Sequence, residues 1–198
     1  MKIVGISCSP RKGKSTKYAL EVCLRTVKET IQETETMLIE LSERKINGCL
    51  ACGKCMKVLE CSQEDDFVKM IPTLSDSELA GLVIATPVYF GSMTSQCKAF
   101  LDRCVMFRRN GFLLRDKVGG VIAVGGVRNG GQEIAIQTVQ AAMLVQDMVV
   151  VSEGRPTSHY GATLWSGHPD GIEKDTFGLE TAQNLGKRVA EVAARMHR

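Results

Sequence analysis

The apolar residues of the chain form two alternating patterns. Uninterrupted apolar runs predict five strands, which cover residues 2–7, 35–41, 79–87, 117–126 and 147–153. Apolar residues at helical spacing predict helices, which cover about 16–31, 95–107, 130–146 and 176–196. The third strand stops at Pro87, within the stretch 79–90. The segments 42–65 and 154–175 fit neither pattern.

The predicted strands are apolar throughout, which is typical of strands buried on both faces of a parallel sheet. Strands that alternate with helices predict an α/β fold of the doubly wound, flavodoxin-like kind. We therefore expect a five-stranded parallel sheet in the order 2-1-3-4-5, with helices on both faces. No internal repeat or linker divides the chain, so residues 1–198 are expected to form one domain.

Composition and charge exclude some classes of function. The formal net charge of +3 is small and the basic residues are spread along the 198 residues, so nothing supports nucleic-acid binding. No apolar stretch is long enough for a membrane span, and the amino terminus has no signal-peptide pattern. A cytoplasmic protein is expected, in which thiols stay reduced and clustered cysteines are more often metal ligands or redox groups than disulfides.

Four of the eight cysteines lie together in the segment 42–65, with the spacing C-x2-C-x2-C-x5-C. They are Cys49, Cys52, Cys55 and Cys61. Consecutive x2 spacings are typical of ferredoxin-type sites, so a [4Fe–4S] cluster is the favoured interpretation, with Cys61 as the fourth ligand. Structural zinc normally uses two separated cysteine pairs, which makes it a weaker alternative. Free or redox-active thiols are the third possibility.

The loop SCSPRKGKST follows the first strand and opens a helix. Hydroxyl groups, positive charge and a helix amino end together suit a terminal phosphate. The residues that would contact it are Ser9, Arg11, Lys12, Ser15 and Thr16. The loop lacks the first glycine of a Walker A motif, so a nucleotide triphosphatase is disfavoured. An ordinary basic turn is the alternative.

Two further loops follow the third and fourth strands. In the first, aromatic rings and backbone N–H groups could contact a planar ring, and the residues are Pro87, Val88, Tyr89, Phe90, Gly91 and Ser92. The second, 125–131, is rich in glycine and contains Gly126 and Arg128, so a ligand could approach its backbone closely. Three such loops at one end of a sheet favour a flavin site.

These segments carry a resemblance to a known family. GISCSPRKGKST, TPVYFGSMTSQCKAFLDR and GGVRNGGQE resemble the three FMN-binding segments of the NADPH-dependent FMN reductase superfamily, and the cysteine loop resembles its iron–sulfur flavoprotein branch. The resemblance implies that Ser9, Arg11, Ser15 and Thr16 hold the FMN phosphate. Residues 87–92 would line the isoalloxazine ring, and loop 125–131 would close over it.

The resemblance also implies a function. A ferredoxin-like donor, or NAD(P)H, would supply electrons that pass through the cluster to FMN and on to a small-molecule acceptor such as dioxygen or peroxide. The resemblance further implies a homodimer or homotetramer, in which the cluster of one subunit serves the FMN of another or lies near it. Two alternatives stay open: an NAD(P)H-dependent FMN or quinone reductase with a vestigial cysteine loop, and a non-catalytic electron carrier or redox sensor.

The remaining residues of chemical interest have simpler interpretations. Cys23, Cys97 and Cys104 lie on predicted helices and are expected to be buried as small hydrophobic side chains. Cys8 lies next to the phosphate loop. The three histidines have no metal-ligand spacing. For His159 and Trp165, packing or surface roles are favoured over a place near the flavin edge.

Overall fold

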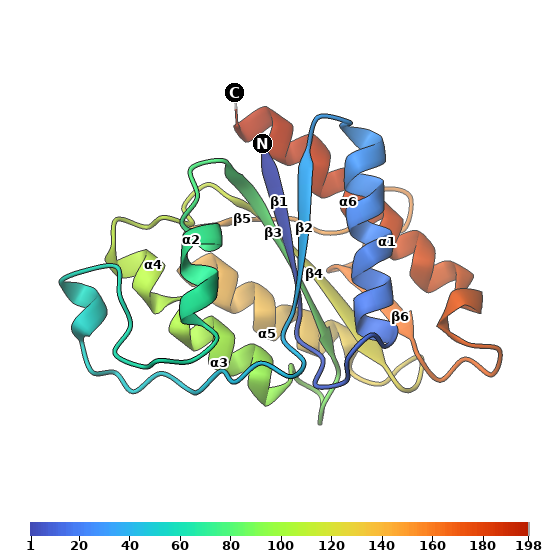
Figure 1. The fold of residues 1–198 in the computed structure, drawn as a ribbon. Helices are drawn as coiled ribbons and strands as arrows, with labels where there is room; N and C mark the ends of the chain where they lie inside the picture. Colours follow the sequence, from blue (N-terminus) through green and yellow to red (C-terminus); the bar gives the residue numbers. More distant parts are fainter. Residues whose placement is uncertain (198) are drawn as a thin grey trace.

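The computed structural model describes residues 1–197, and a six-stranded parallel sheet forms its centre (Figure 1). The strand order is β2-β1-β3-β4-β5, with β6 also paired to β4, so the predicted order is confirmed. The strands are β1 (Lys2–Ser7), β2 (Glu35–Glu40), β3 (Leu79–Pro87), β4 (Val118–Gly125), β5 (Val149–Val150) and β6 (Ala162–Trp165). Every residue of β3 and β4 is buried, as expected for strands covered on both faces.

The sheet edge beyond β4 differs from the prediction. In place of one strand over 147–153, β5 pairs only with Val118 and Gly119 at the start of β4. The chain then leaves the sheet through Gly154, which has a positive φ of 79°, and returns as β6. β6 pairs with Ile122–Gly125 at the other end of β4. Two short strands therefore share the position predicted for one, and the segment 154–175 contains a strand.

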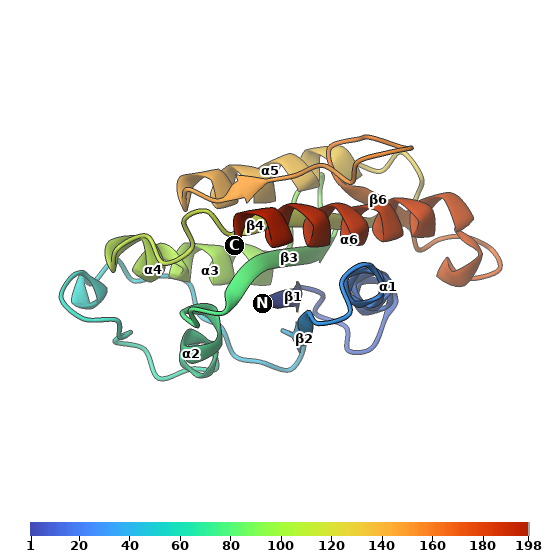
Figure 2. The ribbon, with the colours of Figure 1, turned by 90° about the horizontal axis from the view of Figure 1, so that it is seen from above.

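The helices form a layer on each face of the sheet (Figures 1 and 2). On one face lie α1 (Ser15–Thr30) and α6 (Thr176–Met196). On the other lie α2 (Ile71–Leu74), α3 (Ser95–Arg103), α4 (Val105–Arg109) and α5 (Gln132–Val145). Three short 3-10 helices complete the structure: η1 (Lys54–Met56), η2 (Val68–Met70) and η3 (Ile172–Lys174). The helix predicted over 95–107 is thus two helices, α3 and α4, which meet at Cys104.

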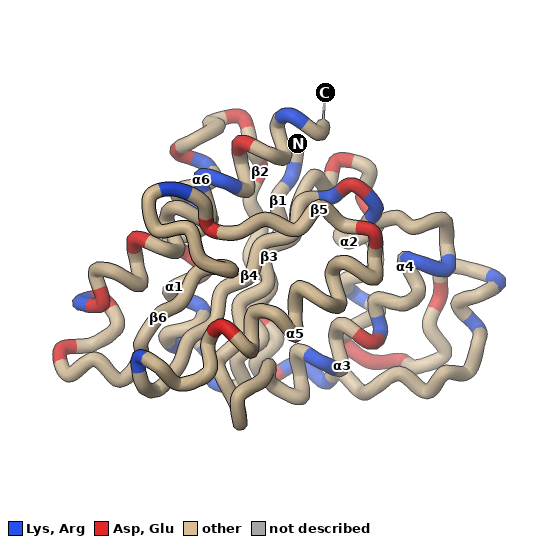
Figure 3. The backbone as a smooth tube through the Cα atoms, turned by 180° about the vertical axis from the view of Figure 1, so that it is seen from behind, with Lys and Arg blue, Asp and Glu red and all other residues tan. Residues whose placement is uncertain are grey.

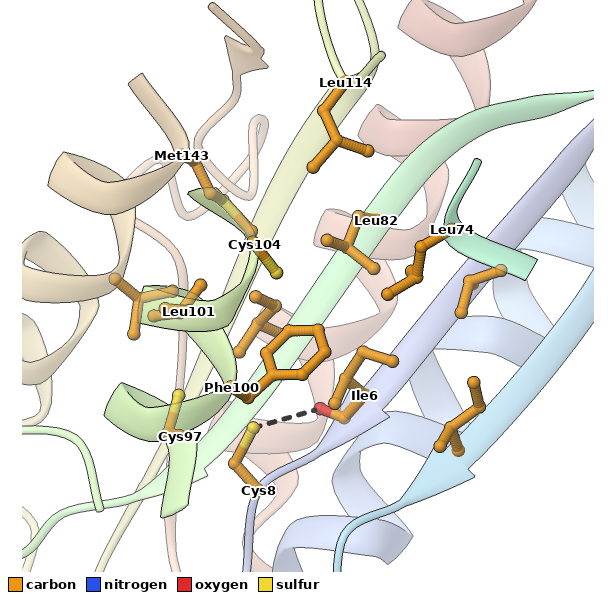
Figure 4. Close-up of a cluster of buried hydrophobic side chains, with 14 of the residues drawn as sticks. Ile6, Cys8, Leu74, Leu82, Cys97, Phe100, Leu101, Cys104, Leu114 and Met143 are labelled. Carbon is orange, nitrogen blue, oxygen red and sulfur yellow. Dashed lines mark hydrogen bonds between the residues drawn. The ribbon is translucent and has the colours of Figure 1, made fainter. Parts of the chain in front are cut away.

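A hydrophobic core fills the space on each side of the sheet. Between the sheet and α3 lie Cys8, Cys97 and Cys104, packed round Phe100 (Figure 4). Cys23 is buried on the opposite face, on the core-facing side of α1, where burial raises the pKa of its thiol to about 12. The predicted burial of the three helical cysteines is confirmed. Cys8 is also fully buried, and the pKa of its thiol is raised well above its ordinary value by that burial.

Along the backbone in Figure 3, Lys and Arg positions are spread over several elements and are interspersed with Asp and Glu positions. Within residues 1–197, none of the helices combines the length and the hydrophobicity that crossing a membrane requires.

Candidate functional site

The loops after β1, β3 and β4 meet at the carboxyl edge of the sheet, the lower edge in Figure 1. Thr94 follows β3 and Cys8 follows β1. The hydroxyl of Thr94 donates a hydrogen bond of 2.8 Å to the carbonyl oxygen of Cys8. The β3 and β4 loops approach at two glycines, since a Cβ on Gly131 would lie 3.2 Å from the Cα of Gly91. The structure therefore brings the three predicted flavin loops together.

The first loop ends at the open amino terminus of a long helix. No side chain caps α1, so the N–H groups of its first turn are left for a ligand. Within the loop, the Ser9 hydroxyl accepts from the backbone N–H of Arg11 at 3.1 Å. Lys12 is paired with Glu43 at 2.7 Å. Ser15 and Thr16 lie in the first turn, and this arrangement fits a phosphate group.

The second loop forms a closed turn that exposes aromatic rings. Tyr89 and Ser92 exchange backbone hydrogen bonds of 2.9 and 3.1 Å across it. Phe90 and Gly91 occupy the centre of the turn with positive φ angles of 49° and 73°. The Phe90 side chain is fully exposed and Tyr89 is 48% exposed. Two uncovered rings at the strand ends can pack on a planar ligand.

The third loop is held by the side chain of Gln132, which donates to the carbonyl of Val127 at 2.7 Å and accepts from the N–H of Gly130 at 2.8 Å. A Cβ added to Gly126 would meet nothing within 4 Å, so a ligand can approach the backbone there. The indole Nε1 of Trp165 donates to the Gly126 carbonyl at 3.0 Å.

Arg128 of this loop is tied to a residue that the sequence did not indicate. Its guanidinium donates to Asp175, a buried carboxylate that also caps α6 by accepting from the N–H of Gly178 at 3.1 Å. The Nη1 nitrogen of Arg128 is buried without a protein partner within residues 1–197. That donor lacks the hydrogen-bond partner that a buried N–H group normally has. His159 pairs with a different residue, since its ring nitrogen Nδ1 lies 2.7 Å from a carboxylate oxygen of Glu153.

The four clustered cysteines line one pocket, in a segment that lies beside α3 and α4 (Figure 1). Cys49 and Cys52 are exposed, whereas Cys55 and Cys61 are partly buried. The Ser62 hydroxyl lies 3.0 Å from the Cys52 sulfur, and this bond is the main reason that the pKa of Cys52 is lowered. In the described part of the chain, no three His, Cys, Asp or Glu side chains are placed to hold a single metal ion. Four thiols that share a pocket suit the corners of a larger cluster.

A buried ion pair anchors the cysteine segment to α3. Arg103 and Asp65 are 2% and 1% exposed, with Nη1 and Nη2 of Arg103 donating to the two carboxylate oxygens at 2.8 and 3.1 Å. Asp65 also accepts from the N–H of Asn47 at 2.9 Å. The guanidinium lies 4.6 Å from the centre of the Phe67 ring. Sequence reasoning missed this pair, since its members are 38 residues apart and nothing in the local pattern joins them.

Comparison with known proteins identifies the family of the chain. The family model described as NADPH-dependent FMN reductase matches residues 1–163. An iron–sulfur flavoprotein of Methanocaldococcus jannaschii is 41% identical over 97% of each chain. One of Methanosarcina thermophila is 38% identical over 97% of this chain and 95% of its own.

Solved structures confirm the fold. RosB, described with a bound formylriboflavin phosphate intermediate, has a TM-score of 0.73 at 17% identity, over 98% of this chain and 79% of its own. A WrbA-like flavodoxin of Agrobacterium tumefaciens has a TM-score of 0.66 at 19% identity, over 100% and 98%. The chain belongs to the NADPH-dependent FMN reductase family and, within it, to the iron–sulfur flavoproteins, as the resemblance of its motifs implies.

Proposed function

We propose that this FMN-dependent oxidoreductase takes electrons singly through a [4Fe–4S] cluster and passes them to FMN. The observation that carries this proposal is the common pocket of Cys49, Cys52, Cys55 and Cys61 beside helix α3. The same helix begins directly after the β3 loop. From Ser95 to Arg103 a helix rises about 12 Å, so one rigid element connects the two sites.

The flavin would lie at the carboxyl edge of the sheet. We assign its phosphate to the amino end of α1 with Ser9, Arg11, Lys12, Ser15 and Thr16. Pro87, Val88, Tyr89, Phe90, Gly91 and Ser92 would line the ring, and Gly126 and Arg128 would approach its edge. When bound, FMN accepts one or two electrons whereas a cubane passes one, so the pair converts between the two modes. Residues 42–65 are then the cluster-binding loop of one FMN-binding domain.

The proposal extends to the electron donor and the electron acceptor. We propose a ferredoxin-like one-electron donor, because Cys49 and Cys52 are exposed and give such a partner access to the cluster. The acceptor is a small molecule, such as dioxygen or peroxide. The second candidate is direct reduction of FMN by NAD(P)H, which the uncovered Tyr89 and Phe90 favour because a nicotinamide could reach the flavin there.

Anaerobically purified protein tests the proposal. We expect bound iron and acid-labile sulfide together with FMN, and faster bleaching of the flavin absorption by chemically reduced ferredoxin than by NADPH. Iron-free protein in which NADPH alone reduces the flavin would support the second candidate.

Replacing Arg11 by Ala is expected to weaken FMN binding by about 1.5–3 kcal/mol, because a charge-assisted bond to the phosphate is lost. Titration of apo protein with FMN and with riboflavin measures this, since riboflavin lacks the phosphate and should be nearly unaffected. Lys28→Ala, on the last turn of α1, is a control with the same change of charge. Equal losses for the two flavins would contradict the assignment of Arg11.

We also propose that the protein assembles as a homodimer or homotetramer. The fully exposed Phe90 ring lies at the flavin loops, and burying it against a second subunit would remove apolar surface from water. Sedimentation of the cofactor-loaded protein measures the assembly, and a monomer at micromolar concentration would overturn this part of the proposal.

A further inference from the structure

Two arginines donate hydrogen bonds to cysteine sulfurs in the pocket. Arg103 Nη2 lies 3.0 Å from the sulfur of Cys61, and Arg109 Nη1 lies 3.3 Å from the sulfur of Cys55. Both arginines come from the continuous α3–α4 segment. The positive donors are therefore directed at two of the four thiols.

The geometry at Arg103 requires a guanidinium. Its Nη1 donates to Asp65 and to the carbonyl of Asn47 at 3.1 Å, while its Nη2 donates to Asp65 and to Cys61. All four terminal N–H bonds of the side chain are thus used. A lysine ammonium has three donors on a single atom and cannot match this fork.

The charges at the two arginines differ. Asp65 neutralises Arg103, and Glu60 of the same pocket pairs with Lys54 at 2.9 Å. Within residues 1–197, Arg109 has no carboxylate within ion-pairing distance. Its positive charge therefore acts on the Cys55 sulfur without a compensating partner.

We propose that Arg103 and Arg109 are positioning residues of the cluster, which hold the thiolates of Cys61 and Cys55 and raise the reduction potential of the group that these ligands bind. Hydrogen bonds to cysteine sulfurs and nearby positive charge both favour the reduced, more negative form. The proposal rests on the function proposed above, because it concerns the same pocket.

Arg109→Gln tests the proposal, and Arg108→Gln is the matched control. Both arginines are exposed on α4, but Arg108 donates to the carbonyl of Val145 at 2.7 Å and, within residues 1–197, donates no hydrogen bond to a cysteine sulfur. The readout is the midpoint potential of the cluster in anaerobic redox titrations, with iron and sulfide content measured for each variant. At the midpoint potential of the unmodified protein, we expect Arg109→Gln to raise the ratio of oxidised to reduced cluster about tenfold, or ~59 mV for one electron. Arg108→Gln should leave the ratio almost unchanged.

Arg103→Lys gives a second test, since it keeps the charge and loses the fork. We expect a lower midpoint potential for Arg103→Lys. If this variant does not fold, the comparison of Arg109→Gln with Arg108→Gln tests the proposal alone. Equal potentials for Arg108→Gln and Arg109→Gln in iron-loaded protein would overturn the inference while leaving the proposed function intact. Absence of iron and sulfide from the unmodified protein would overturn both.

Discussion

Replacing Cys55 by Ala is expected to abolish electron transfer from reduced ferredoxin to FMN, with loss of nearly all bound iron. A methyl group cannot replace a thiolate ligand, and a cubane held by three protein ligands in an open pocket loses stability. FMN should stay bound, because its three loops lie at the carboxyl edge of the sheet and contain none of the four clustered cysteines. Iron assay, flavin absorption and stopped-flow reduction of the anaerobic protein measure the three effects.

The control for this variant is Cys23→Ala. Cys23 is a buried residue of α1 on the opposite face of the sheet, so its removal should leave the iron content and the rate of flavin reduction unchanged. If Cys55→Ala retained its full iron and its rate, the pocket would not be the cluster site.

Replacing Asp65 by Ala is expected to lower the free energy of unfolding by about 3–5 kcal/mol. The change leaves the Arg103 guanidinium, which is only 2% exposed, without its counter-charge. It also removes the acceptor for the N–H groups of Asn47 and Phe67. Urea denaturation followed by circular dichroism gives the difference. Asp66→Ala is the matched control, because Asp66 is more exposed and pairs with the exposed Lys69. This variant should lose much less free energy of unfolding. Equal losses would contradict the role given to the buried pair.

The same pair makes stability depend on pH. Burial alone would raise the pKa of Asp65, but the bonds and charge of Arg103 together with the N–H groups of Asn47 and Phe67 hold that pKa below its ordinary value. The contribution of Asp65 is therefore complete above about pH 4, the ordinary range of an aspartate, and is lost as the pH falls through the lowered value. In Asp65→Ala this part of the acid sensitivity should be missing.

The sequence predicts the elements whose pattern is local and complete. β1, β3 and β4 are continuous apolar runs, and α1 and α6 show helical periodicity over their whole lengths. The division between β5 and β6 was not predictable in this way. Each pairs with a different part of β4, and β5 has only two residues, so what defines them is a partner strand rather than their own composition.

The candidate site follows the same rule. The clustered cysteines were visible because their spacing is contiguous, and the flavin loops were visible because they follow predicted strands. The residues that support these cysteines and loops were not visible in the sequence. Asp175 reaches Arg128 across 47 residues, and Arg109 reaches Cys55 across 54, so both contacts depend on the completed fold.

The cysteine segment, residues 42–65, lies between β2 and β3 in the sequence. The short helix η1 within this segment buries no side chain. Ile46, Cys55 and Leu59 of the segment are only partly buried against one core, and most of both cores comes from the strands and helices. Long surface insertions of this kind cost a folded domain little. The cofactor content of this architecture is therefore coupled to its fold mainly at the buried Arg103–Asp65 pair. An ancestral flavin enzyme would gain or lose a second redox centre by a change of length between β2 and β3 together with a change at that pair.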